Sequence, residues 1–203
     1  MLGSEQLRTI LSHLDNPAIN GLFYRAIPNA ALYSKEPPQP LWSLGPGLSG
    51  QRFSPIEGPP ALYVAEQPQT AFYEANGLGA SLFSVKSEDR PMPVPTTILT
   101  IKVSLNHVLD LTKASMIAAL GITQNEILCS WQELMIKDLP VPTHILADTV
   151  YQSHRYQGVR FPSSKETGAI NLMIWMDKIK TPSFVEVHDP SGRLWQRIPE
   201  DKT

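Results

Sequence analysis

The chain has 203 residues and a formal net charge of −2, with 42% hydrophobic and 18% charged residues. This length and composition suit one sizeable soluble globular domain, and the near-neutral charge argues against direct nucleic-acid binding, which usually needs a strongly basic surface. No apolar run approaches the ~20 residues of a membrane-spanning helix, the first residues lack a secretory signal, and the single Cys129 excludes an internal disulfide. We therefore expect a cytoplasmic protein with no membrane partner.

The first half of the chain predicts a helix, two short strands and a second helix. Residues 4–15 carry apolar side chains at helical spacing, while 22–27 and 61–65 are short apolar runs typical of strands. Between those strands, 28–60 is rich in turn residues and predicts a long functional loop. A proline that suits the first helical turn predicts a helix over about 68–75.

The second half of the chain alternates helical patterns with short strands. In 96–105 apolar and polar residues alternate, as in a half-buried strand. Thr123 and Glu126 form a capping box, which predicts a helix that begins there and continues through Met135. The other expected elements are two helices, two strands and a C-terminal hairpin, at 113–120, 143–155, 159–161, 172–176 and 184–198.

These elements predict an α+β fold, a single domain with short mixed β-strands and flanking helices. No internal repeat and no linker divides the chain. Residues 1–20 are expected to form an N-terminal helical extension. The catalytic domain is expected over 21–203, with its core over roughly 21–176 and a C-terminal hairpin at 183–198.

Several motifs lack the context that their usual functions require. Residues 45–50 match the glycine pattern of dinucleotide-binding loops, but no strand precedes them and prolines follow, so we expect a mobile loop. Ser49 lacks the helix that a nucleophile elbow needs. The five histidines have no ligand spacing, which predicts no metal site. Cys129 lies within a helical pattern, which favours a buried structural thiol over a nucleophile.

Two arginines and a tyrosine are candidates for ligand binding. Arg25 closes a strand and Arg52 lies in a loop rich in glycine and proline. Either could be solvated or ion-paired, but the planar guanidinium also suits a phosphate. Tyr63 lies between Leu62 and Val64, which point to the opposite face of a strand. It is either a core residue or an aromatic platform for a flat ring.

A glutamate and two serines complete the candidate set. Glu74 shares a helix face with small neighbours at Thr70 and Ala71, and it is either a surface residue or a carboxylate in a cleft. Ser163 and Ser164 follow a strand and a proline, where they either form an ordinary turn or contact a ligand. Taken in order, the cations, the aromatic ring, the carboxylate and the serine suit a site that holds a phosphorylated nucleotide and cleaves a glycosidic bond.

This ordered set resembles the RES-domain family, which is named for its arginine, glutamate and serine. The segments that carry the resemblance are Phe23-Tyr24-Arg25, Gln51-Arg52-Phe53-Ser54, Leu62-Tyr63-Val64-Ala65-Glu66, Thr70-Ala71-Phe72-Tyr73-Glu74, and 156–164 before Asn171-Leu172. Family members resemble ADP-ribosyltransferase toxins, so the resemblance implies an ADP-ribosyltransferase-like fold. The family often has Trp-Asn after the second arginine, where this chain has Phe53-Ser54.

The resemblance implies a bacterial toxin that consumes NAD by cleaving the nicotinamide–ribose bond, through hydrolysis or phosphorolysis. Its partner would be a helix-turn-helix antitoxin of the Xre type. A protein ADP-ribosyltransferase and a non-catalytic NAD-binding or interaction domain remain alternatives. The acceptor is open between water, phosphate and a protein side chain.

The resemblance also assigns roles to the candidate residues. The catalytic residues would be Glu74, Arg52, Tyr63 and Ser163. The residues that bind NAD would be Arg25, Arg52, Tyr63, Tyr73 and Ser164. In this assignment the arginines hold the phosphates, the Tyr63 ring contacts the nicotinamide end, and the glutamate stabilises the ribose cation. Whether Ser163 or Ser164 is the site serine stays open, and no metal is implied.

Overall fold

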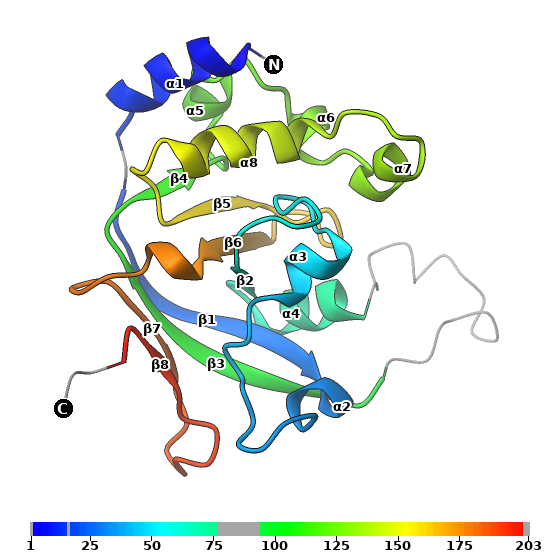
Figure 1. Cartoon of the computed structure of the whole chain (residues 1–203), viewed down its shortest axis with the longest axis vertical. Helices are drawn as coiled ribbons and strands as arrows, with labels where there is room; N and C mark the ends of the chain where they lie inside the picture. Colours follow the sequence, from blue (N-terminus) through cyan, green and yellow to red (C-terminus); the bar gives the residue numbers. More distant parts are fainter. Residues whose placement is uncertain (1, 16, 77–93, 201–203) are drawn as a thin grey trace.

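The computed structural model describes residues 2–15, 17–76 and 94–200, and one eight-stranded sheet forms its centre (Figure 1). The strand order is β4-β5-β6-β2-β1-β3-β7-β8. Among these strands β4 and β5 pair in parallel and the other neighbours are antiparallel, so the sheet is mixed. The strands are β1 Ile19–Pro28, β2 Ala61–Ala65, β3 Thr96–Leu105, β4 Val108–Asp110, β5 Gly158–Pro162, β6 Ile170–Trp175, β7 Phe184–Val187 and β8 Arg197–Ile198.

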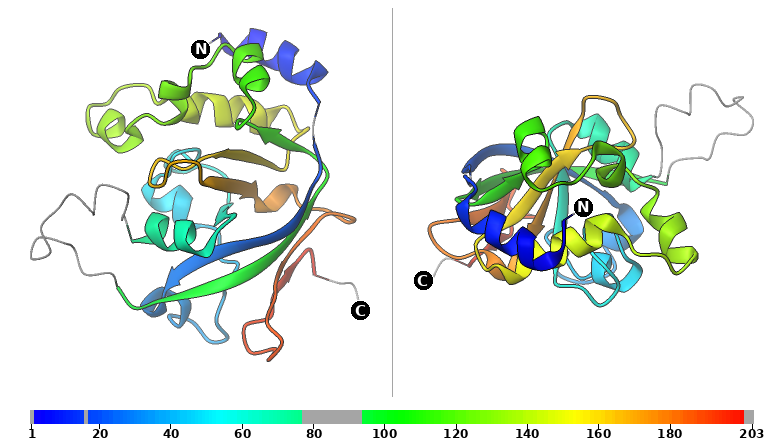
Figure 2. Two further views of the ribbon diagram at one scale, coloured as in Figure 1. Left: turned by 180° about the vertical axis from the view of Figure 1, so that it is seen from behind. Right: turned by 90° about the horizontal axis from the view of Figure 1, so that it is seen from above.

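Short helices flank the sheet. They are α1 Ser4–His13, α2 Asn29–Leu32, α3 Gly45–Ser49, α4 Pro68–Ala75, α5 Ala114–Ala119, α6 Gln124–Ile127, α7 Trp131–Ile136, α8 Pro142–Gln152 and a 3-10 turn at Met176–Lys178. The views from behind and from above show α1, α5 and α8 gathered over the end of the sheet that holds β4 and β5 (Figure 2). The predicted α+β fold with a single domain and short mixed strands is confirmed.

The sheet is nearly divided between β1 and β2. These neighbours share one pair in register, Tyr24 with Ala65. By contrast, β1 pairs with β3 along its whole length, and β2 pairs with β6 along its whole length. The halves β4-β5-β6-β2 and β1-β3-β7-β8 therefore diverge from a single point of contact, as Figure 1 shows.

Two apolar cores lie on opposite faces at this division. On β2, Leu62 and Val64 are buried in one core, whereas the Tyr63 ring packs against the other, as the strand alternation predicts. The core on the Tyr63 side includes Leu7 and Leu11 of α1, which are both fully buried. The N-terminal helix is therefore packed against the body of the domain, where it contacts α8.

Four local features differ from the sequence-based predictions. The predicted single helix from Thr123 to Met135 is wrong, because the chain breaks into α6 and α7, although the capping box itself is present. Residues 45–49, expected as a mobile loop, form the short helix α3. The three-residue strand β4 was not expected, and β1 begins before the predicted residue 22.

Within the described ranges, no helix is both long enough and apolar enough to cross a membrane.

Candidate functional site

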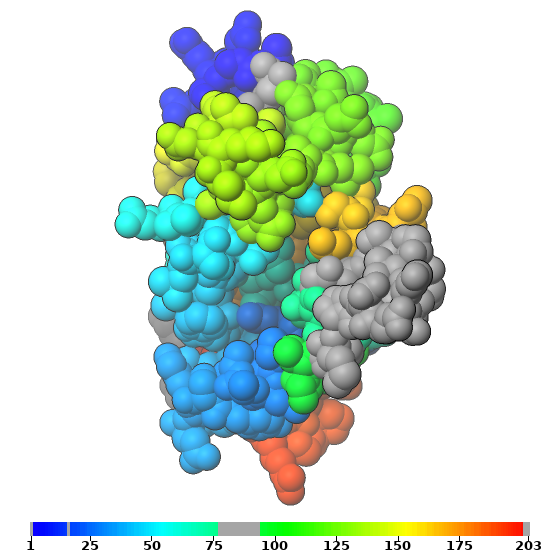
Figure 3. Space-filling view, turned by 90° about the vertical axis from the view of Figure 1, so that its right-hand side faces the viewer, coloured from blue at the N-terminus to red at the C-terminus, as the bar shows by residue number. Residues whose placement is uncertain are grey.

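A pocket of about 750 Å³ lies where β1 and β2 diverge. Its walls come from both strands, from α3 and α4, and from the segment between α6 and α7. In the space-filling view the surface is hollowed between the cyan residues of the α3 region and the gold turn that follows β5 (Figure 3). The near-division of the sheet therefore supplies the space for a ligand.

Glu74 projects into this pocket from α4. The predicted helix is confirmed, with Pro68 in its first turn. One oxygen of the carboxylate, Oε1, accepts hydrogen bonds from Ser163 Oγ and Asn171 Nδ2, each at 2.7 Å. The other oxygen, Oε2, accepts none from the described part of the chain. The carboxylate is therefore fixed in direction and keeps one oxygen available to a ligand.

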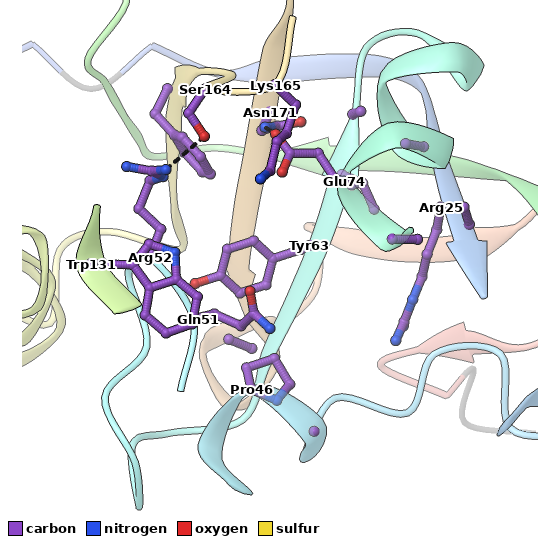
Figure 4. Close-up of a pocket in the computed structure, with 18 of the residues that line it drawn as sticks. Arg25, Pro46, Gln51, Arg52, Tyr63, Glu74, Trp131, Ser164, Lys165 and Asn171 are labelled. Atoms are coloured by element: carbon purple, nitrogen blue, oxygen red, sulfur yellow. Dashed lines mark hydrogen bonds between the residues drawn. The ribbon is translucent and has the colours of Figure 1, made fainter. Parts of the chain in front are cut away.

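Ser163 and Ser164 have different partners. The buried Ser163 hydroxyl donates to Glu74 and accepts from the backbone N–H groups of Lys165, at 3.0 Å, and Glu166, at 3.3 Å. The Ser164 hydroxyl accepts from Nη2 of Arg52 at 2.7 Å, which Figure 4 marks with a dashed line. Ser164 lines the pocket, whereas Ser163 lies behind Glu74 and orients its carboxylate.

The Arg52 guanidinium forms hydrogen bonds to the chain where α6 ends and before α7 begins. Its Nη1 donates to the carbonyl oxygens of Ile127 at 2.8 Å and Cys129 at 2.9 Å. A continuous helix would direct such carbonyls along its axis to its own backbone N–H groups, whereas at the break both accept from the guanidinium, and Cys129 O also accepts from the Trp131 N–H at 2.9 Å. Burial lowers the pKa of Arg52. Among the described residues no carboxylate forms an ion pair with it.

Arg25 lines the opposite end of the pocket. Its guanidinium donates to the carbonyl oxygens of Pro40 at 3.0 Å and Trp42 at 2.8 Å. Burial of this charged group lowers the pKa of Arg25 to about 10, so it stays charged at neutral pH. In Figure 4, Tyr63 and Glu74 lie between Arg25 and Arg52. Two separate guanidinium groups therefore line one pocket, and hydrogen bonds to neutral backbone carbonyl groups hold each of them in place.

The Tyr63 hydroxyl is engaged by the protein. It accepts from the backbone N–H of Phe53 at 3.1 Å and bonds to Ser54 Oγ at 2.9 Å. Burial raises the pKa of Tyr63, so the hydroxyl stays neutral. Phe53 is itself buried, with its ring centroid 4.5 Å from that of Phe161. The Phe53-Ser54 pair therefore anchors the Arg52 turn to Tyr63, which leaves the ring of the tyrosine to face the pocket.

Two of the candidates do not line the pocket: Ser163, which bonds to Glu74 from behind it, and Tyr73. The Tyr73 hydroxyl accepts from Gln69 Nε2 at 2.9 Å. Conversely, the candidate set omitted Asn171 and Lys165, which both line the pocket. A polar residue inside the apolar run of β6 was the available signal for Asn171. Nothing in the sequence distinguishes Lys165 from an ordinary surface lysine.

The prediction of a buried Cys129 within a helix is wrong. The residue is half-exposed, lies between α6 and α7, and lines the pocket. Partial burial raises the pKa of its thiol, which therefore stays protonated and is a poor nucleophile. In the part of the chain that the structure describes, no three His, Cys, Asp or Glu residues gather as a metal site would need.

Comparison with known proteins identifies the family to which this chain belongs. The family model of the RES domain matches residues 22–196. A comparison with curated protein sequences gives no match. Among solved structures, the M. tuberculosis MbcT–MbcA toxin–antitoxin complex is similar in fold, with a TM-score of 0.68 and 18% identity, covering 91% of this chain and 90% of that chain. Because the family model spans well over half of its length, this chain belongs to the RES domain family.

Proposed function

We propose that this RES-domain protein is a toxin of a toxin–antitoxin pair and that it consumes NAD by breaking the nicotinamide–ribose bond. The observation that carries the proposal is the Glu74 carboxylate, which has one oxygen fixed and one available in a pocket with two arginines. Guanidinium groups without a carboxylate partner favour an anionic ligand such as a dinucleotide. A fixed carboxylate suits a reaction in which positive charge develops on the ligand.

In this proposal Arg25 and Arg52 attract the phosphates, and the Tyr63 ring contacts the nicotinamide end. When the bond breaks, its electron pair leaves with the nicotinamide nitrogen, which becomes neutral. Positive charge then develops at the ribose carbon, where Glu74 Oε2 stabilises it. Water or phosphate attacks that carbon, and attacking water releases a proton. No strong acid is needed, because the leaving group departs from a cationic state.

Release of nicotinamide from NAD by the purified protein tests the activity. Hydrolysis would yield ADP-ribose, whereas phosphorolysis would require added phosphate and yield a phosphorylated product. Absence of release with and without phosphate would contradict the proposal. Labelled NAD in a cell lysate separates the alternatives, because label on protein would indicate an ADP-ribosyltransferase, and NAD binding without release would indicate a binding domain.

The proposed partner is a helix-turn-helix antitoxin of the Xre type, acting in the cytoplasm. The similar M. tuberculosis structure is a complex of a toxin with its antitoxin, which supports a partner of this kind. Two exposed apolar residues, Leu48 on α3 and Ile136 on α7, belong to helices that border the pocket and offer a surface to such a partner. Co-expression with the neighbouring gene should relieve growth arrest. Unchanged arrest in the presence of a stable complex would contradict the proposal.

A further inference from the structure

A second connection joins α4 to the turn after β5, outside the pocket. The Thr70 hydroxyl donates to Glu166 Oε2 at 2.6 Å. Thr70 is fully buried, and it lies one helical turn before Glu74, so both side chains leave the same face of α4. The helix therefore reaches this turn through Glu74 to Ser163 and through Thr70 to Glu166, whose other carboxylate oxygen also accepts from Gln69 Nε2 at the long distance of 3.5 Å.

The turn that carries Glu166 and Ser163 is internally bonded. The backbone N–H of Ser163 donates to Ala169 O at 2.8 Å, and the N–H of Ala169 donates to Glu166 O at 3.2 Å. The N–H of Glu166 donates to Ser163 Oγ at 3.3 Å. Because these bonds tie its residues together, a displacement of Glu166 is transmitted to the hydroxyl that orients Glu74.

We propose that Thr70 and Glu166 are positioning residues for the Glu74 carboxylate. The kinetic part of this inference rests on the proposed function. Neither residue lines the pocket, so neither is expected to contact NAD. A hydroxyl-to-carboxylate hydrogen bond at this distance is among the stronger ones in proteins. It holds the first turn of α4 against the 163–169 turn, which keeps Ser163 within hydrogen-bond distance of Glu74.

Substitution of Thr70 tests the inference with matched controls. Thr70→Val keeps the shape and removes the donor, and it should lower kcat by about tenfold to a hundredfold with little change in KM, since small displacements of a reacting group have effects of this size. Thr70→Ser keeps the hydroxyl and should restore kcat. Thr143→Val removes a hydroxyl from another buried threonine outside the pocket and should leave kcat unchanged. Equal kcat for Thr70→Val and wild type would overturn the inference.

Two further measurements separate positioning from general stability and from failure of the proposed function. In a Glu74→Gln background, Thr70→Val should cause no further loss of turnover, because its effect acts through Glu74. An additional loss as large as in the wild type would contradict the inference. If the wild type releases no nicotinamide, backbone hydrogen exchange still tests whether Thr70 holds the 163–169 turn. Faster exchange of the 163–169 amides in Thr70→Val supports the connection, and unchanged exchange overturns it.

Discussion

The side-chain amide of Asn171 donates to Glu74 Oε1 at 2.7 Å, although the two residues are 97 positions apart in the sequence. Together with the Ser163 hydroxyl, it occupies one oxygen of the carboxylate and aims the other at the pocket. The geometry makes Glu74 the residue on which the proposed reaction depends most.

Glu74→Gln should lower nicotinamide release about a hundredfold or more, with little change in NAD affinity. The charge acts mainly when the ribose becomes cationic, so its removal affects the transition state more than the bound ground state. Steady-state kinetics and a melting curve are the measurements, with Glu5→Gln on the exposed face of α1 as a control. Near-normal turnover in a normally folded Glu74→Gln protein would remove Glu74 from the catalytic role.

Arg52→Ala should weaken NAD binding and also destabilise the fold. Its guanidinium donates to the carbonyls of Ile127 and Cys129 and to the Ser164 hydroxyl, so the substitution removes three charge-assisted hydrogen bonds, although Cys129 O keeps the Trp131 N–H as a donor. Hydrogen bonds to a charged group contribute about 1.5–3 kcal/mol each, so the melting temperature should fall measurably. Arg8→Ala is the control, because Arg8 is exposed and, among the residues that the structure describes, its guanidinium donates to Gln152 alone. Equal melting temperatures for the two variants would contradict this prediction.

Lys165→Met should raise the KM for NAD roughly tenfold and leave kcat almost unchanged. Lys165 lines the pocket, and its ammonium group forms no hydrogen bond or ion pair within the described residues, so its charge is available to a phosphate. The effect should shrink at high salt because exposed charges are screened. Lys180→Met, an exposed lysine outside the pocket, is the matched control, and an equal change in KM for both variants would sink the prediction.

Stability should fall in mild acid through His144. Its Nε2 donates to Gln51 O at 2.7 Å, and burial lowers the pKa of its ring below the ordinary 6.5. The unfolded chain therefore takes up the proton first as the pH falls, so the free energy of unfolding declines from about pH 6.5 to the folded pKa and then levels. Melting curves from about pH 7.5 to 5 should show a smaller decline for His144→Gln. Parallel curves would exclude His144 as the cause.

Thr143→Val should stabilise the protein by about 1 kcal/mol. The Thr143 hydroxyl is fully buried at the start of α8 and forms no hydrogen bond with any described residue, so valine removes an unsatisfied polar group without changing the shape. Thr149→Val on the same helix is the comparison, because that hydroxyl donates to Ile145 O at 2.9 Å. A higher melting temperature is expected for the first variant and no gain for the second. Equal changes in melting temperature for the two variants would contradict this prediction.

Much of the fold was predictable because its elements depend on local patterns. The alternation in 96–105 and the first-turn proline of α4 mark β3 and α4 correctly. The break between α6 and α7 was not predictable, because the carbonyls at the break accept from Arg52, which is distant in sequence. A local helical pattern cannot contain that tertiary contact.

The candidate site was predictable in part for a similar reason. Chain order singled out Arg52, Tyr63 and Glu74, which the structure brings to one pocket. Tyr73 failed to join them, because adjacent residues on a helix point about 100° apart, whereas Thr70, one turn away, shares the face of Glu74. Asn171 joins the site only through strand pairing, which places β6 beside β2.

The pocket has room between β1 and β2 because these strands share a single pair, Tyr24 with Ala65. Every further pair between β1 and β2 would add backbone hydrogen bonds and make the sheet more continuous, but it would also draw together the walls that carry Arg25 and Tyr63. The missing pairs between β1 and β2 therefore leave the space that the pocket occupies. Substitutions that extend the pairing between β1 and β2 should raise the free energy of unfolding and close the pocket to a ligand.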